Sequence, residues 1–318
     1  MHRVLPWGEI DDVAEVLASR EVHASMSLMA STRTLGSPGS PGAGTGVIDA
    51  PTGLPDIDWR APWFEAVAAY GQRALACDDW RLALSTQADA AQLATGQGQP
   101  LRFVAQENLP VATAYEAFIA ATGGVPTRRN LHDFFNALIW LTFPRAKAAL
   151  NARQAGAIAT DGVQATRGAT RDAATLFDEN AVLFACSEPS LGEALRAFDW
   201  HTLFVTRRAD WGRACEVQAF GHALLEKLVS PYKSVTAHAW IVDVPHDYFD
   251  APPLQRRRWL DERIAPPLMS APLSTRQFAP LPVLGIPGWW SANEDPAFYR
   301  DASVFRPGRR EKSAANAR

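Results

Sequence analysis

Residues 127–154 read TRRNLHDFFNALIWLTFPRAKAALNARQ, and this stretch predicts a helix at the centre of the fold. At about 100° per residue, its apolar side chains cover one broad face of the helix. That face holds Leu131, Phe134, Phe135, Leu138, Ile139 and Leu141. The narrower stripe opposite holds His132, Asp133 and Asn136, together with Trp140 and Phe143. A helix that is apolar on nearly every side is normally buried, so we expect the polar stripe to face an interior pocket or a satisfied network.

The composition is that of a soluble globular protein with a sizeable core, because 47% of the 318 residues are hydrophobic and 20% are charged. The formal net charge of −3 gives no basic surface for nucleic acid. No apolar run approaches the roughly 18 residues of a membrane span. Three widely spaced cysteines form no CxxC pair, and the acidic N-terminal sequence does not fit a signal peptide. We therefore expect a cytoplasmic protein that binds neither nucleic acid nor membrane.

The chain divides into three parts by composition. Residues 31–56 are rich in Gly, Pro, Ser and Thr, and such a segment cannot bury enough apolar surface to offset its ordering entropy. We therefore expect an N-terminal extension with a disordered linker over residues 1–57, one folded domain over 58–307, and a disordered tail over 308–318.

The sequence of residues 58–307 predicts an α+β fold. We expect a helix-rich single domain around a small mixed sheet, with an irregular C-terminal wrap. Helices are expected over residues 62–77, 79–95, 112–122, 130–142, 144–157, 169–178, 191–198, 215–229 and 253–264. Strands are expected over residues 101–106, 181–187, 201–207 and 236–244, which are rich in β-branched and aromatic side chains. The prolines of PLPVLGIPGWW favour irregular coil in the last third.

The polar stripe of the central helix has two interpretations. Asn130 is a good N-cap, and Asp133 three residues later can return a hydrogen bond to its backbone, which would explain Asp133 by capping alone. His132 would then lie near the positive end of the helix dipole, where the neutral imidazole is favoured. A neutral histidine can be a general base or a metal ligand, and it can equally be a core residue bonded to a carbonyl group.

A second group follows in the sequence QAFGHALLEK, residues 218–227. Gln218, His222 and Glu226 are spaced four apart and so share one face of the helix expected here. The histidine and the glutamate can share a metal, or the glutamate can orient the imidazole, although a solvated ion pair is the commoner arrangement. Gly221 beside His222 indicates close approach by another backbone or by a ligand.

A third group lies in RGATRDAATLFDEN, residues 167–180. Arg171, Asp172, Thr175, Asp178 and Glu179 share one face of the expected helix. This face is either an exposed one laced with salt bridges, ending at Asn180 as a left-handed cap, or part of a site. In a site, carboxylates beside an arginine could hold a metal or tune an acid/base pair.

His238, in the apolar strand sequence VTAHAWIV, needs a polar partner if it is buried. His132, His222 and His238 together with a carboxylate have the composition of a metal site. Buried polar groups must find partners, and the simplest solution is that they satisfy one another. We therefore expect at least two of these histidines to lie within about 10 Å of each other, in one pocket with Asp172 or Asp178.

Motifs of well-known enzyme classes are absent: the sequence has no GxGxxG after a strand, no GxxxxGK[ST] loop, no GxSxG elbow and no HExxH. Four segments do resemble one family. They are VPTRRNLHDFFNALIWLTFPRAKAALNARQ, RGATRDAATLFDEN, AFGHALLEKLVSPYKSVTAH and GIPGWWSANEDPAFYRDASVFRP. In this order they resemble the domain-of-unknown-function family 3025, from about Asp58 to Pro307. The resemblance implies a bacterial single-domain protein whose C-terminal PGWW…FRP segment belongs to the folded unit, and it carries over no activity.

Two functions fit these residues. In the first, the protein is a hydrolase of a small molecule, in which His132 or His222 acts as general base or metal ligand. Asp172, Asp178 or Glu226 would be the acidic partner and Arg171 an anion clamp, with Asp133 and Asn136 in the same pocket. A divalent metal is the one cofactor that the residues suggest. In the second, the protein is a noncatalytic binding or regulatory protein whose His, Asp and Arg residues form a buried structural network. An open cleft favours the first, and a sealed network favours the second.

The expected domain boundary is open to a direct test. Limited proteolysis of the full chain should cut within residues 31–56 and leave a stable core, because a segment that is not packed reaches the protease without unfolding. Cleavage is followed by mass spectrometry of the fragments. Protection of residues 31–56 under conditions that cut other loops would contradict the boundary.

Overall fold

Two consecutive helices form where residues 127–154 predict them. In the computed structural model, which describes residues 53–161 and 169–308, these are α5 (Leu131–Thr142) and α6 (Pro144–Asp161). The Asn130 side chain accepts a hydrogen bond from the Asp133 backbone N–H at 2.8 Å, which fixes the start of α5. Pro144 has no N–H to donate and begins the next helix. Every residue of α5 from Asp133 to Thr142 is buried, so α5 is a central helix as the sequence predicts.

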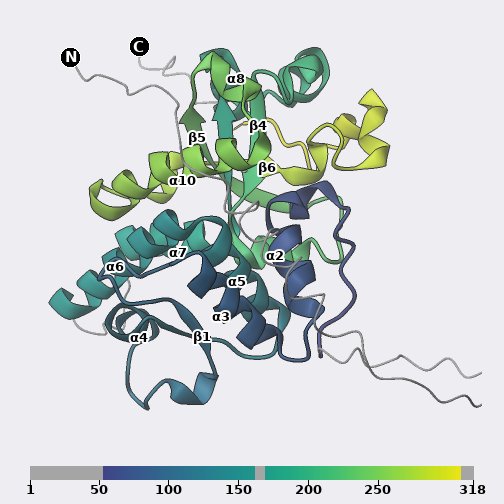
Figure 1. Cartoon of the computed structure of the whole chain (residues 1–318). Helices are drawn as coiled ribbons and strands as arrows, with labels where there is room; N and C mark the ends of the chain where they lie inside the picture. The colour runs from purple at the N-terminus through teal and green to yellow at the C-terminus, as the bar shows by residue number, and fades with distance from the viewer. Residues whose placement is uncertain (1–52, 162–168, 309–318) are drawn as a thin grey trace, which may run out of the picture. The chain divides into compact units, whose positions relative to one another are not determined.

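The other α-helices among the described residues surround α5 and the sheet (Figure 1). They are α2 (Glu65–Leu75), α3 (Trp80–Ala90), α4 (Tyr115–Thr122), α7 (Ala169–Asn180), α8 (Pro189–Arg196), α9 (His222–Lys227) and α10 (Pro253–Ser270). Helices α2, α3, α6 and α9 pack against α5, and α10 packs along α6. Within this described part, every helix is too short or too polar to span a lipid bilayer.

The sheet is small and mixed, as expected. Its strands are β3 (Ala181–Cys186), β4 (Cys215–Ala219), β5 (Thr236–Asp243) and β6 (Phe278–Pro282), in the order β4-β3-β5-β6. Strand β3 is buried along its whole length and pairs antiparallel with β4 and parallel with β5. A separate parallel pair joins β1 (Arg102–Val104) to β2 (Gly124–Pro126). The described part of the chain is therefore α+β.

The prediction of a helix over residues 215–229 is wrong for the first half of this range. Residues 215–219 form β4, because they pair with the buried strand β3 in the register Val182↔Ala219 to Cys186↔Cys215. The helix α9 begins only at His222. Gln218 consequently lies on a strand, whereas His222 and Glu226 keep their four-residue spacing on one short helix.

Three smaller expectations also need correction. Residues 202–206 form a turn of π-helix instead of a strand, and Leu203 and Phe204 are buried in that conformation. Residues 278–282, expected as coil, form β6, since an edge strand tolerates proline. Asn180 is not a left-handed cap: α7 runs directly into β3, and the Asn180 side chain donates to the Thr236 carbonyl at 3.0 Å.

The irregular C-terminal wrap is part of the folded unit. After β6 the chain forms short 3₁₀ turns over Val283–Gly285, Ser291–Glu294 and Pro296–Arg300. The Trp200 indole donates to the Arg306 carbonyl at 2.7 Å, and the Tyr299 ring stacks on Phe204 with 5.4 Å between ring centres. Aromatic packing therefore fixes a segment that has little regular hydrogen bonding of its own.

Gly221, at the start of α9, generates a prediction. A Cβ atom there would lie 2.6 Å from backbone atoms of Asn180 and Ala181, so Gly221→Ala should destabilise the fold by about 1–3 kcal/mol. Gly156→Ala on α6 is the matched control, because a Cβ atom there meets nothing within 4 Å and alanine favours helix. Urea unfolding followed by circular dichroism measures both. Equal stabilities of the two variants would contradict the close packing at Gly221.

Candidate metal centre

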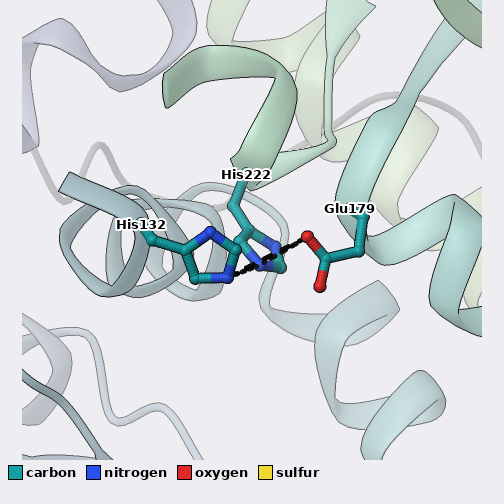
Figure 2. Close-up of side chains that lie close together, drawn as sticks. All are labelled: His132, Glu179 and His222. Carbon is teal, nitrogen blue, oxygen red and sulfur yellow. Dashed lines mark hydrogen bonds and ion pairs between the residues drawn. The ribbon is translucent and has the colours of Figure 1, made fainter. Parts of the chain in front are cut away.

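Three side chains from three helices bring one ligand atom each to a common point (Figure 2). The Nε2 atom of His132 on α5 lies 3.1 Å from that of His222 on α9. The Oε2 atom of Glu179 on α7 lies 3.5 Å from His222 Nε2 and 3.9 Å from His132 Nε2. A point equidistant from these atoms lies about 2 Å from each, which is the length of zinc–nitrogen and zinc–oxygen bonds. The triangle therefore has the dimensions of a two-histidine, one-carboxylate metal site.

The antiparallel pairing of β3 and β4 explains why Glu179 and His222 meet. Helix α7 ends where β3 begins, and α9 begins just after β4 ends. Because β3 and β4 are antiparallel, with Val182 opposite Ala219, the end of α7 and the start of α9 lie at the same end of the sheet. The N–H groups of Phe220 and Gly221 both donate to the Ala181 carbonyl, which closes this junction. Helix α5 then packs against α9 and supplies His132.

The far nitrogen of each histidine faces a carboxylate. His132 Nδ1 lies 3.0 Å from Glu226 Oε2, so it carries the proton and donates to that oxygen. His222 Nδ1 is buried 3.9 Å from Asp178 Oδ2, and the Asp178 backbone also favours a proton on this ring. With protons on both Nδ1 atoms, both Nε2 atoms present lone pairs to one point. Lone pairs 3.1 Å apart repel each other unless a cation lies between them, and carboxylate–histidine pairs of this kind orient metal ligands.

The protonation states suit a cation. Burial lowers the pKa of His222 to about 4, against the opposing charge of Asp178, so the imidazole is neutral at neutral pH. Burial raises the pKa of Glu179, and the Asp178 charge adds to this effect. A bound cation would reverse that shift by stabilising the Glu179 carboxylate.

A buried lysine lies behind the triangle. The Lys147 side chain on α6 is only 5% exposed, and its ammonium donates to Asp178 Oδ1 at 2.6 Å and to Asn136 Oδ1 at 2.8 Å. It also lies 5.4 Å from the centre of the Trp140 ring. Burial alone would raise the pKa of Asp178, but Lys147 and His222 hold it below its usual range. Asp178 is therefore an ionised residue inside the protein.

The triangle opens into a cleft of about 510 Å³. Arg128, on its wall, pairs with the Asp133 carboxylate through two hydrogen bonds of 2.9 Å each. Glu116 accepts a hydrogen bond from the Asn151 amide at 2.7 Å, and burial raises the pKa of Glu116 to about 7. Arg171 also lines the cleft and has no ion-pair partner among the described residues.

The expected convergence is present for two histidines. His132 and His222 meet in one cleft beside Asp178, with Asn136, Asp133 and Arg171 also on its lining. Asp172 is exposed and is not among the described residues that line the cleft. His238 is placed apart from the triangle: its ring lies 3.2 Å from the Asn180 amide, which gives this half-buried residue its polar partner.

Asp133 differs from the capping-box interpretation. Its backbone N–H is capped by Asn130, but its carboxylate accepts from the Arg128 backbone N–H at 2.6 Å instead of from that of Asn130. Sequence reasoning left Glu179 open between an exposed face and a site and did not choose it as a site residue, and it gave Lys147 no role. The one available signal for Lys147 was rarity, because the chain has only four lysines.

The family model of proteins of unknown function DUF3025 matches residues 101–309, and the chain belongs to this family. The match includes the triangle, Lys147 and the cleft residues named above, and it begins later than the boundary near Asp58 that the motifs suggested. No curated protein and no solved structure matches the chain.

The buried ion pair predicts a large effect on stability. Lys147→Met should destabilise the fold by about 3–5 kcal/mol, because it leaves the Asp178 charge buried without its partner. Combining Lys147→Met with Asp178→Leu should recover most of this loss, since no charge then remains unpaired. Urea unfolding of the wild type, both single variants and the double variant measures the coupling. If the two single losses simply add, the pair is not coupled as described.

Proposed function

We propose that this protein is a divalent-metal-dependent hydrolase of a small molecule, with His132, Glu179 and His222 as the metal ligands. The observation that carries the proposal is the triangle of ligand atoms with edges of 3.1, 3.5 and 3.9 Å at the wall of a cleft. Three protein ligands are the usual number in catalytic zinc sites, where a further position stays open. When bound there, a divalent ion supplies an activated water molecule and polarises the bond to be cleaved.

The charges around the triangle support a divalent cation. Asp178, Glu179 and Glu226 bring three negative charges to the two histidines; Lys147 pairs with Asp178, and the Lys227 charge also acts on Glu179. A divalent ion would offset the negative charge that remains. Surplus negative charge in a partly buried site is costly without such compensation.

The exposure of the ligands supports a site and not a sealed network. The side chains of His132 and Glu179 are 33% and 38% exposed, whereas that of His222 is 5% exposed. One side of the triangle is therefore open to the cleft, and the other rests on the protein interior. The noncatalytic alternative, a buried network that only specifies the core, describes Lys147, Asp178 and Asn136 well but leaves the two open ligands without a reason.

Residues of the cleft wall can supply the remaining chemistry. Glu116 lines the cleft with its pKa raised to about 7, which suits proton transfer near neutral pH. Arg171 can bind an anionic group of the substrate. Glu226 holds the His132 ring in place through Nδ1, so it acts as a positioning residue.

Metal binding is the first test. The chelator-treated full chain should bind Zn²⁺ with one ion per chain, and His132→Ala or His222→Ala should abolish tight binding. Glu226→Ala should weaken it by about 10–100-fold, because it releases the His132 ring. His246→Ala is the control, since this side chain is 76% exposed in a turn and should leave the affinity unchanged. Calorimetric titration measures all four variants. Binding that is equally strong in His222→Ala would overturn the assigned site.

The hydrolase part is tested with the same proteins. Chromogenic carboxylic esters, phosphoesters and amides are offered to the Zn²⁺-loaded chain. Turnover of at least one class should vanish in His222→Ala and persist in His246→Ala. Tight metal binding without turnover of any class would favour a noncatalytic metal-binding protein.

A further inference from the structure

A chain of three hydrogen-bonding groups leads from the buried lysine to the cleft. Lys147 can only donate, so the Asn136 atom that faces it at 2.8 Å must be the carbonyl oxygen Oδ1. The amide group Nδ2 of Asn136 is thereby directed the other way, where it donates to the Tyr115 hydroxyl oxygen at 3.1 Å. The lysine charge thus fixes which end of the Asn136 amide faces the cleft.

This orientation decides what Tyr115 can do. Its oxygen already accepts a hydrogen bond from Asn136, so its own hydrogen is left for another acceptor. Among the residues that the structure describes, none accepts a hydrogen bond from Tyr115. Because burial raises the pKa of Tyr115 well above its ordinary value, with nearby Glu116 adding to the effect, the hydroxyl keeps its hydrogen at neutral pH.

Tyr115 lines the same cleft as His132 and His222. Asn136, to which it is bonded, lies one turn from His132 on the same face of α5, a rise of about 5–6 Å. An oxygen held by a metal at about 2 Å can also accept a hydrogen bond of about 2.7 Å, so a ligand that meets both groups spans the cleft between the triangle and Tyr115.

We infer that Tyr115 donates its hydroxyl hydrogen to an anionic oxygen of the ligand bound at the His132–Glu179–His222 centre. The ligand class is an oxyanion: a carboxylate, a phosphate or the tetrahedral oxyanion formed during hydrolysis. Lys147 and Asn136 are positioning residues for this donor. The inference rests on the proposed function, because it requires a metal at the triangle. It adds Tyr115 as the group that recognises an anionic oxygen of the ligand.

The test uses the full chain loaded with Co²⁺, whose visible absorption reports ligands entering the metal site. Two probes are titrated: acetohydroxamate, which binds metals through oxygen and offers an anionic acceptor, and imidazole, which binds through nitrogen and offers none. Tyr115→Phe should weaken acetohydroxamate binding by about tenfold, the loss of one charge-assisted hydrogen bond, and leave the affinities for Co²⁺ and imidazole unchanged.

A second variant tests the direction of the hydrogen bonds with Tyr115 intact. Asn136→Asp replaces the amide donor by an acceptor, so the Tyr115 hydroxyl would turn back toward position 136. Acetohydroxamate affinity should then fall relative to imidazole affinity, as in Tyr115→Phe. A merely structural tyrosine would not produce this selective loss.

The outcomes separate the two proposals. If the wild type binds Co²⁺ and both probes but neither variant lowers the ratio of acetohydroxamate to imidazole affinity, the donor role of Tyr115 is wrong and the metal site stands. If both probes weaken equally, the variants disturb the metal and the donor role is again wrong. If the wild type does not bind Co²⁺, the proposed function fails and takes this inference with it.

Discussion

Lys147 and Asp178 meet at 2.6 Å in a part of the protein where water barely reaches either side chain. Removing either charge from water costs several kcal/mol, and only their mutual attraction with further hydrogen bonds makes the arrangement tolerable. Helices α6 and α7, which carry them, must therefore come together before the polar interior is stable. The start of α6 is held in turn by Asp261 of α10, which accepts from the Arg145 and Ala146 backbone N–H groups at 3.0 and 2.8 Å.

The same ion pair organises both sides of the site. Through Asp178 it places a negative charge behind His222, and through Asn136 it directs the Tyr115 hydroxyl toward the cleft. The proposed metal ligand His222 and the proposed hydrogen-bond donor Tyr115 therefore both depend on the buried charge of Lys147. Such networks are most stable when every member is satisfied, which makes the free hydrogen of Tyr115 an informative exception.

Local patterns in the sequence predict much of this arrangement. The periodicity of residues 131–142 identifies a buried helix, and Asn130 identifies its start. The rule that buried polar groups need partners is enough to predict that at least two of His132, His222 and His238 lie together, and His132 and His222 do. These inferences succeed because each depends on a few neighbouring residues or on a general energetic requirement.

The remaining features depend on tertiary pairing. The segment CEVQA is too short to distinguish a strand from a helix, and only its register with β3 decides. Glu179 joins the two histidines because β3 and β4 are antiparallel, and Lys147 is buried because Asp178 lies opposite it. No single stretch of sequence contains either relation, and charged side chains of these two types are ordinarily found at the surface.

The close contact at Gly221 has a consequence for how the family can vary. The glycine supplies no metal ligand itself, yet its position against the backbone of Asn180 and Ala181 lets α9 begin beside the end of α7. Relatives that keep histidine at this site and a carboxylate at position 179 should therefore keep glycine before the histidine. The constraint comes from the backbone of the β3–β4 junction and not from the ligands, so relatives that have lost the ligands but keep this junction should keep the glycine too. A residue without chemistry of its own thus marks the junction on which the centre is built.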